Sequence, residues 1–290
     1  MKKILLTSLL VFSLLFTAGS CEQTEKPEMS LLAINVRKAD ALLLRCGRST
    51  YLIDTGIKKN SETLLDTLRK EGVTRLTGVI LTHTHADHVG GLKALLESEI
   101  VVENIYTSKY YVLKKEDGKH PVEKATKKTD YEINYLASGD TLPLDGGKLT
   151  VIGPLELNEE AENNNSLVLL AEGGGGSILL TGDMEFPEED SLLKAGLIPH
   201  ADVLKIGNHG EGDATSIAFV NAVQPSLAVI STNTEDEPDT PDPRVLKLLE
   251  NNRIPVLVTQ DAEEGVLITQ DAEEGVLVTL RNGEITTEMK

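Results

Sequence analysis

The sequence has few aromatic residues, and it has fewer basic than acidic side chains. Aromatic residues make up 3% of the 290 positions and tryptophan is absent, which argues against a carbohydrate site built from stacked rings. The chain holds 46 Asp and Glu against 28 Lys and Arg, and its formal net charge is −18. Binding to duplex DNA depends on Lys and Arg that displace counterions, so we expect that nucleic acid is not a partner.

The densest basic stretch runs from Lys109 to Lys128 and is interspersed with Glu116, Asp117 and Glu123. We interpret it as a solvated helical insertion. A local positive groove there could still admit a small anionic substrate.

The apolar run Ile4 to Phe16 is too short to cross a bilayer comfortably, which takes about 20 residues. Lys2-Lys3 precede it and Ala18-Gly19-Ser20 follow, a pattern typical of a signal peptide over residues 1–20. Cys21 comes next and resembles the cysteine of a bacterial lipobox. We therefore predict an extracytoplasmic, membrane-anchored lipoprotein with lipid on Cys21, a tether over residues 21–30 and one domain over residues 31–290. The alternative is an ordinary cleaved signal and a secreted protein.

Cysteine is scarce, because Cys46 is the only one besides Cys21. If Cys21 carries lipid, no intramolecular disulfide can form, so extracellular stability must come from packing and metal. Cys46 ends an apolar segment and is expected to pack as a small hydrophobic side chain.

The most informative segment is His83-Thr84-His85-Ala86-Asp87-His88. Neutral imidazole and carboxylate are ligands that borderline divalent metals such as Zn²⁺ prefer. An apolar segment over residues 79–81 precedes these side chains and indicates a buried strand, and Gly90-Gly91 opens a helix. Ligands in a loop between a strand and a helix are typical of functional sites in α/β proteins.

This motif resembles that of the metallo-β-lactamase superfamily, whose fold is a four-layer αββα sandwich of the mixed α/β (α+β) class. The resemblance implies that Asp54 supports the metal loop from behind, that Asp183 bridges two metal ions, and that His209 belongs to the second metal site. The expected metal ligands are His83, His85, Asp87, His88, Asp183 and His209.

A narrower resemblance covers roughly residues 31–282. The segment from Ala33 to Leu44 is similar to the DVGQGDAILI opening of the soluble hydrolase domain of ComEC-type competence proteins, and Asn163 to Leu169 is similar to that family's NxNSLVL strand. Related domains also occur as free-standing secreted or anchored hydrolases, so a role in DNA uptake does not follow. The resemblance implies a metal-dependent hydrolase of phosphodiester bonds, and the enzymatic alternative is a β-lactam or lactone hydrolase.

The sequence departs from these patterns at the metal site. Asn208 and Thr240 stand where the family has histidines, and Arg37 and Ala39 replace glycines of the opening motif. The third histidine of the first site in true β-lactamases is absent, and the run Asn163–Asn165 lies in its place. Asn165 and Asn208 are therefore possible ligands or supporting residues, and a catalytically degenerate, anchored binding module is the non-enzymatic alternative.

The expected chemistry follows from two divalent ions, Zn²⁺ or Mn²⁺. A bound ion lowers the pKa of its water toward ~7, which generates hydroxide at neutral pH, and a second ion polarises the substrate oxygen. Asp87 and Asp183 are the predicted catalytic residues, and Asp87 is expected to orient the nucleophile. The expected substrate is a small anionic molecule or a phosphodiester. His120 and His200 have no motif context and are expected at the surface.

Apolar periodicity predicts the remaining elements. Strands are expected over residues 31–36, 41–46, 50–53, 78–82, 149–152, 166–171, 177–181, 203–206 and 227–231. Helices are expected over residues 61–71, 91–98, 187–195, 215–223 and 243–252. Gly173–Gly176 predict a hairpin turn, and Asp242-Pro243 predict a helix cap and first-turn proline. The ten residues Val256–Gly265 recur almost unchanged as Val266–Gly275, which we interpret as a short duplication that forms an extra strand and turn.

Overall fold

The computed structural model describes residues 27–112, 120–260, 275–282 and 284–289. The predicted signal peptide and the lipidation site Cys21 lie outside the described residues, and so does most of the duplicated segment. The first strand begins at Met29, two residues before the predicted start of the domain.

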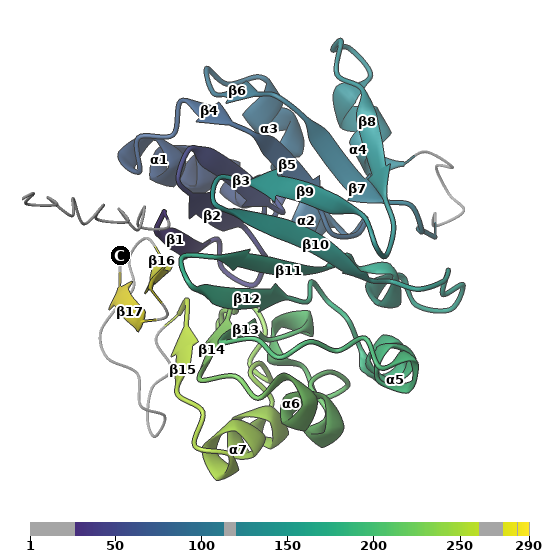
Figure 1. Ribbon diagram of the computed structural model, residues 1–290. Coiled ribbons are helices and arrows are strands. Elements are labelled where there is room, and N and C mark those ends of the chain that lie inside the picture. The colour runs from purple at the N-terminus through teal and green to yellow at the C-terminus, as the bar shows by residue number, and fades with distance from the viewer. Residues whose placement is uncertain (1–26, 113–119, 261–274, 283, 290) are drawn as a thin grey trace, which may run out of the picture.

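The described strands form two large sheets (Figure 1). The first sheet has eight strands in the order β17-β16-β1-β2-β3-β5-β7-β8. Its strands are β1 (Met29–Ile34), β2 (Leu42–Cys46), β3 (Ser49–Ile53), β5 (Gly78–Leu81), β7 (Ile105–Ser108), β8 (Ile133–Leu136), β16 (Gly275–Arg281) and β17 (Glu284–Met289). A separate pair, β4 (Arg75–Leu76) and β6 (Val101–Val102), lies beside it.

The second sheet has seven strands in the order β15-β14-β13-β12-β11-β10-β9. They are β9 (Thr141–Leu144), β10 (Gly147–Gly153), β11 (Val168–Gly173), β12 (Gly176–Leu180), β13 (Val203–Lys205), β14 (Leu227–Ile230) and β15 (Val256–Val258). The predicted glycine turn joins β11 to β12, where Gly174 and Gly175 adopt positive φ angles that glycine tolerates without steric cost.

Helices cover the outer face of each sheet. They are α1 (Ser61–Lys70), α2 (Ala86–Val89), α3 (Leu92–Leu96), α4 (Pro121–Thr126), α5 (Phe186–Ala195), α6 (Ile217–Val223) and α7 (Pro243–Asn251), with 3-10 turns η1 (Lys58–Asn60), η2 (Glu162–Asn165) and η3 (Asn208–Gly210). Figure 1 shows α1, α3 and α4 on one side of the paired sheets and α5, α6 and α7 on the other. The predicted cap of α7 is confirmed, because Asp242 Oδ1 accepts a hydrogen bond from the Arg244 amide.

Three apolar cores hold these layers together. One lies between the sheets and contains Leu44 of the first sheet and Leu180 of the second. Another joins the first sheet to α1, α3 and α4, and includes Leu68. The third joins the second sheet to α5, α6 and α7, and includes Phe219. The predicted αββα sandwich is therefore confirmed.

Parallel pairing determines where a functional site can lie. In the first sheet β3, β5, β7 and β8 run parallel, and in the second sheet β12, β13, β14 and β15 run parallel. The carboxyl ends of parallel strands meet at one edge of a sheet, which is where α/β proteins bind ligands.

The predicted extra strand and turn of the duplicated segment fall mostly on residues 261–274, outside the described residues. The first copy of the segment begins with β15 in the second sheet, whereas the chain after it returns as β16, which pairs antiparallel with β1 in the first sheet. In the described part of the chain, no helix combines the length and the apolar composition that crossing a membrane requires.

Candidate metal centre

The predicted metal ligands and the supporting residue Asp54 all follow the carboxyl ends of these parallel strands. Asp54 comes directly after β3, His83 and His85 follow β5, and Asp183 follows β12. Asp87 and His88 lie in α2, and His209 lies in η3 after β13. Both sheets therefore contribute side chains to one point.

The structure brings the six predicted ligands together in two groups that share Asp183. Ligand atoms of Asp87, His88, Asp183 and His209 lie within 4.8 Å of one another, and so do those of His83, His85 and Asp183. From Asp183 Oδ2, the distances to the imidazole Nε2 atoms are 2.9 Å for His88, 3.6 Å for His209 and 3.7 Å for His83.

The donor set fits divalent metal ions. His83 Nε2, His209 Nε2 and Asp183 Oδ1 are buried and have no hydrogen-bond partner among the described residues. Unpaired polar atoms in an interior are costly, and three of them face the same cluster. Groups of imidazole and carboxylate ligands around a shared carboxylate are suited to divalent metal ions.

Asp54 supports the histidine loop through hydrogen bonds. Its Oδ2 accepts hydrogen bonds from His88 Nδ1 and from the Thr82 hydroxyl, both at 2.8 Å, and its Oδ1 accepts one from the Thr82 amide. A proton on Nδ1 leaves the Nε2 lone pair of His88 directed at the cluster, because the carboxylate fixes the tautomer. Asp54 has a positive φ angle of 60°, a strained conformation that aims its carboxylate at the loop.

His209 and His83 are oriented in the same way. His209 Nδ1 lies 2.8 Å from the carbonyl oxygen of Ser231, which accepts its proton. His83 Nδ1 lies 3.2 Å from the hydroxyl oxygens of both Thr82 and Ser166. In both histidines, Nε2 is left for a metal ion.

Burial and neighbouring charges shift the pKa values of the clustered aspartate and histidines. Burial raises the pKa of Asp183, but His88 and His209 outweigh it and hold that pKa well below its usual value. Burial lowers the pKa of His88, yet the carboxylates of Asp183 and Asp54 raise it well above the ordinary value. Burial, together with the neighbouring His88, lowers the pKa of His83 well below 6.5. A metal ion at the second group therefore competes with a proton on His88.

The two asparagines have other partners. The Asn165 amide nitrogen donates to the Asn158 carbonyl and to Glu162, and its oxygen accepts from the Asn158 amide. Asn208 donates to Asp213 Oδ1 at 3.0 Å. Both side chains brace loops beside the cluster, and neither belongs to the two groups of ligand atoms.

Sequence reasoning missed Ser166, the neighbour of Asn165. Its hydroxyl oxygen accepts the Asp183 amide proton at 3.1 Å and lies 3.2 Å from His83 Nδ1. It therefore connects His83 of the first group to the backbone of the residue that supplies the shared carboxylate. A serine before an apolar strand carries no metal signal of its own, so only the fold reveals this role.

The prediction for His120 is wrong. Its side chain is 1% exposed, its ring packs edge-on against Tyr111 with centroids 4.5 Å apart, and its Nδ1 accepts from the Val122 amide at the start of α4. The predicted solvated insertion is also wrong in part, because Val122 buries one face of α4 in the core of the first sheet. His200 is exposed and Cys46 is buried, as predicted.

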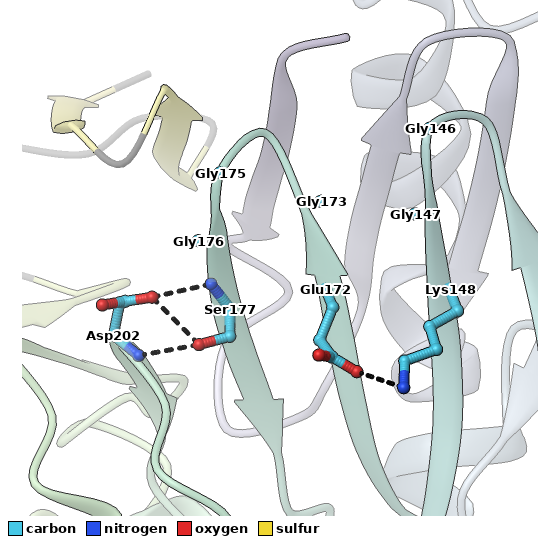
Figure 2. A pocket seen from close by; sticks show the side chains of 9 residues that line it. All are labelled: Gly146, Gly147, Lys148, Glu172, Gly173, Gly175, Gly176, Ser177 and Asp202. Carbon is cyan, nitrogen blue, oxygen red and sulfur yellow. Dashed lines mark hydrogen bonds and ion pairs between the residues drawn. The ribbon is translucent and has the colours of Figure 1, made fainter. Parts of the chain in front are cut away.

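A separate pocket of about 440 Å³ lies at the other end of the second sheet (Figure 2). It is lined by the glycine turns and by the pairs Lys148–Glu172 and Ser177–Asp202. Ser177 lies near the start of β12 and Asp183 follows the end of that strand, six residues further along the chain, or up to about 20 Å at the usual rise of a strand. Close packing explains why glycine occurs here, because a Cβ on Gly147 would lie 1.9 Å from the Glu172 carbonyl oxygen. This pocket is distinct from the metal cluster.

Comparison with known proteins identifies the family. The profile of the metallo-beta-lactamase superfamily matches residues 34–231, and the chain belongs to that superfamily. ComE operon protein 3 of Bacillus subtilis is 33% identical over 196 residues, which are 68% of this chain and 25% of that protein. Recombination protein 2 of Haemophilus influenzae is 27% identical over 230 residues, 77% of this chain and 26% of that protein.

These relatives agree with the predicted similarity to the ComEC-type hydrolase domain. The chain spans about a quarter of the length of these curated relatives. Among solved structures, the metallo-beta-lactamase fold protein YhfI from Bacillus subtilis superposes with a TM-score of 0.55 at 16% identity, covering 88% of this chain and 100% of that one. That likeness supports the fold.

Proposed function

We propose that the protein is a metal-dependent hydrolase with two divalent ions, and that it cleaves phosphodiester bonds of small anionic substrates. One observation carries the proposal: Asp183 Oδ2 lies 2.9–3.7 Å from three imidazole nitrogens, which come from loops of both sheets. With the opposed sheets holding these loops, the ligands are positioned before a metal ion or a substrate arrives.

Two ions in these groups would supply an activated water and an electrophile for the substrate oxygen. The protein's own part is to orient both. Asp87 is the most exposed of the acidic ligands, and its Oδ2 lies 3.5 Å from His209 Nε2. Burial raises the pKa of Asp87, but the neighbouring imidazoles of His209 and His88 lower it below its usual value. Asp87 is therefore ionised at neutral pH and can accept a proton or a hydrogen bond from the attacking water.

Phosphodiester cleavage is favoured over other hydrolyses by the oxygen-rich ligation and by the relation to the ComEC-type domain. Asp183 and Asp87 supply carboxylates to the second group, and the first group contains two imidazoles rather than three. Oxygen ligands suit Mn²⁺ as well as Zn²⁺.

The test is turnover of bis-p-nitrophenyl phosphate by chelated and then metal-reloaded protein. Reloading with Zn²⁺ or Mn²⁺ should restore turnover, and His209→Ala should abolish it. The matched control is His200→Ala, because His200 is exposed and outside the cluster. Turnover of nitrocefin alone would favour β-lactam hydrolysis, and metal binding without turnover of either compound would favour the degenerate binding module.

We also propose that the mature protein is extracytoplasmic and anchored by lipid on Cys21. The support is the arrangement of Lys2-Lys3, the apolar run and the small residues before Cys21. Cys21→Ala should move the protein from the membrane fraction of a bacterial host to the soluble fraction. Equal membrane recovery of both forms would contradict the anchor.

A further inference from the structure

Three loops lie next to Asp87 and His209 and are joined to one another by hydrogen bonds and ion pairs. The loop of residues 35–41 is attached to α2, because the Asp40 amide donates to the Asp87 carbonyl at 3.2 Å. The segment after β13 contains His209 itself. The segment after β14 begins with Ser231, whose carbonyl oxygen accepts from His209, and the Asp242 amide donates to the Gly210 carbonyl. We refer to these three loops, residues 35–41, 206–216 and 231–242, as the rim of the metal cluster.

Ion pairs connect the three loops across the rim. Arg37 Nε lies 2.7 Å from Asp236 Oδ2, and Arg37 Nη2 lies 3.0 Å from Glu235. Lys38 Nζ lies 2.5 Å from Glu211 Oε1. The first loop therefore carries two adjacent cations, and each is held by acids from a different segment.

The backbone that presents these cations is strained. Arg37 has a φ angle of 68°, a left-handed conformation that is unfavourable for a residue with a side chain. Such conformations persist where the surrounding structure holds them, and they cluster at functional sites. This turn directs Arg37 toward Glu235 and Asp236, and it directs Lys38 toward Glu211.

Lys38 differs from Arg37 because most of its hydrogen-bond donors have no partner in the described part of the chain. Arg37 is held by two carboxylates. The Lys38 ammonium carries three donors and, among the described residues, has Glu211 as its one hydrogen-bond partner. Its side chain is 19% exposed, and it lies in the field of Asp87. Burial lowers the pKa of Lys38, but Glu211, Glu237 and Asp87 outweigh it and raise that pKa. The ammonium is a charged donor group beside the metal ligands.

We propose that Lys38 binds the anionic group of the substrate and that Glu211 is an internal competitor for it. The proposal deepens the proposed function and rests on it. A substrate phosphate oxygen takes a free donor of Lys38 and weakens its pair with Glu211, since both anions share one ammonium. The competing carboxylate keeps the affinity for simple anions low.

The same rim restricts the class of substrate. The acids Glu211, Glu235, Asp236 and Glu237 face the cations Arg37, Lys38 and Lys59. Within the three rim loops, acidic side chains outnumber the two cations Arg37 and Lys38, and this excess of negative charge disfavours a long polyanion. A small phosphodiester with a single negative charge is the class that fits Lys38.

Calorimetric titration with inorganic phosphate tests the proposal on the metal-loaded protein, with equal metal content verified for every variant. Glu211→Gln should bind phosphate about 5–10-fold more tightly than the parent, and Lys38→Met about 5–10-fold more weakly, as for a partly exposed ion pair. The double variant should bind like Lys38→Met, and Lys38→Arg should retain most of the affinity. The control is Lys194→Met on α5, whose exposed ammonium pairs with Asp190 and should change nothing.

The proposal is overturned if Glu211→Gln binds phosphate no better than the parent, if its gain survives in the double variant, or if the parent binds no phosphate at all. These outcomes are separate from the proposed function, which fails when the parent binds phosphate and metal but does not hydrolyse bis-p-nitrophenyl phosphate. In the active protein, KM for that substrate should follow the order of the phosphate affinities.

Discussion

Replacing Lys205 by Met should destabilise the fold strongly, although among the described residues no hydrogen bond or ion pair joins its ammonium to a predicted metal ligand. Lys205 and Asp40 are 0% and 1% exposed at their side chains, and Nζ lies 3.0 Å from Asp40 Oδ2 and 3.0 Å from the Ile206 carbonyl oxygen. The pair joins β13 of the second sheet to the loop between β1 and β2 of the first. Asp40 Oδ1 already has no hydrogen-bond partner among the described residues, so Lys205→Met leaves a buried carboxylate without its counter-charge.

Breaking one side of a buried ion pair costs about 3–5 kcal/mol. For a domain of this size, 1 kcal/mol corresponds to about 2–4 °C in Tm, so Tm should fall by roughly 6–20 °C. Asp40→Asn should cause a similar loss, since it leaves the Lys205 ammonium buried without a carboxylate. The double variant Asp40→Asn/Lys205→Met removes both charges and should recover much of the stability.

The assay is thermal unfolding of metal-free protein followed by circular dichroism, which separates this effect from metal binding. Lys194→Met is the control, because its exposed pair with Asp190 should contribute less than about 1 kcal/mol. If Lys205→Met lowers Tm no more than Lys194→Met does, the reasoning about the buried pair is refuted.

Three further predictions concern the cluster and the second sheet. Asp183→Ala should abolish hydrolysis and leave expression nearly unchanged, because both groups of ligand atoms share this carboxylate; undiminished turnover would contradict the ligand assignment. The apparent metal affinity, measured by chelator competition, should increase as the pH rises above 6.5. The reason is that the pKa of His88 is raised, so a proton occupies this ligand below that pKa. An affinity that does not change with pH would contradict competition between proton and metal. Burial raises the pKa of Glu188 from 4.5 to about 7, so its contribution to stability is complete below pH 4.5 and is lost as the pH rises through 7. Between pH 5 and 8 the parent should therefore lose about 1–2 kcal/mol more stability than Glu188→Gln, measured by urea unfolding, and equal losses would disprove the role of Glu188.

Local sequence pattern predicts the parts of the fold that depend on neighbours in the chain. Apolar runs mark the strands because buried parallel strands lack polar alternation, and the ligands follow at strand ends. Since His83, His85, Asp87 and His88 lie within six consecutive residues, their spacing alone predicts most of the site.

Long-range partners leave no comparable local pattern. Lys205 and Asp40 are 165 residues apart, and a single lysine in an apolar strand does not reveal which carboxylate neutralises it. The pairing of β16 with β1 likewise depends on the order of strands in the sheet, which periodicity does not encode. The prediction for His120 fails because its burial comes from the tyrosines that pack around it, Tyr111 and Tyr135.

The central claim is that side chains from both sheets converge to capture divalent cations, and metal content per chain tests it most directly. Protein dialysed against Zn²⁺ or Mn²⁺ and freed of excess ions should contain about two ions per chain by mass spectrometry, and His200→Ala should contain the same number. A parent protein that retains no ion after exposure to both metals would contradict the claim.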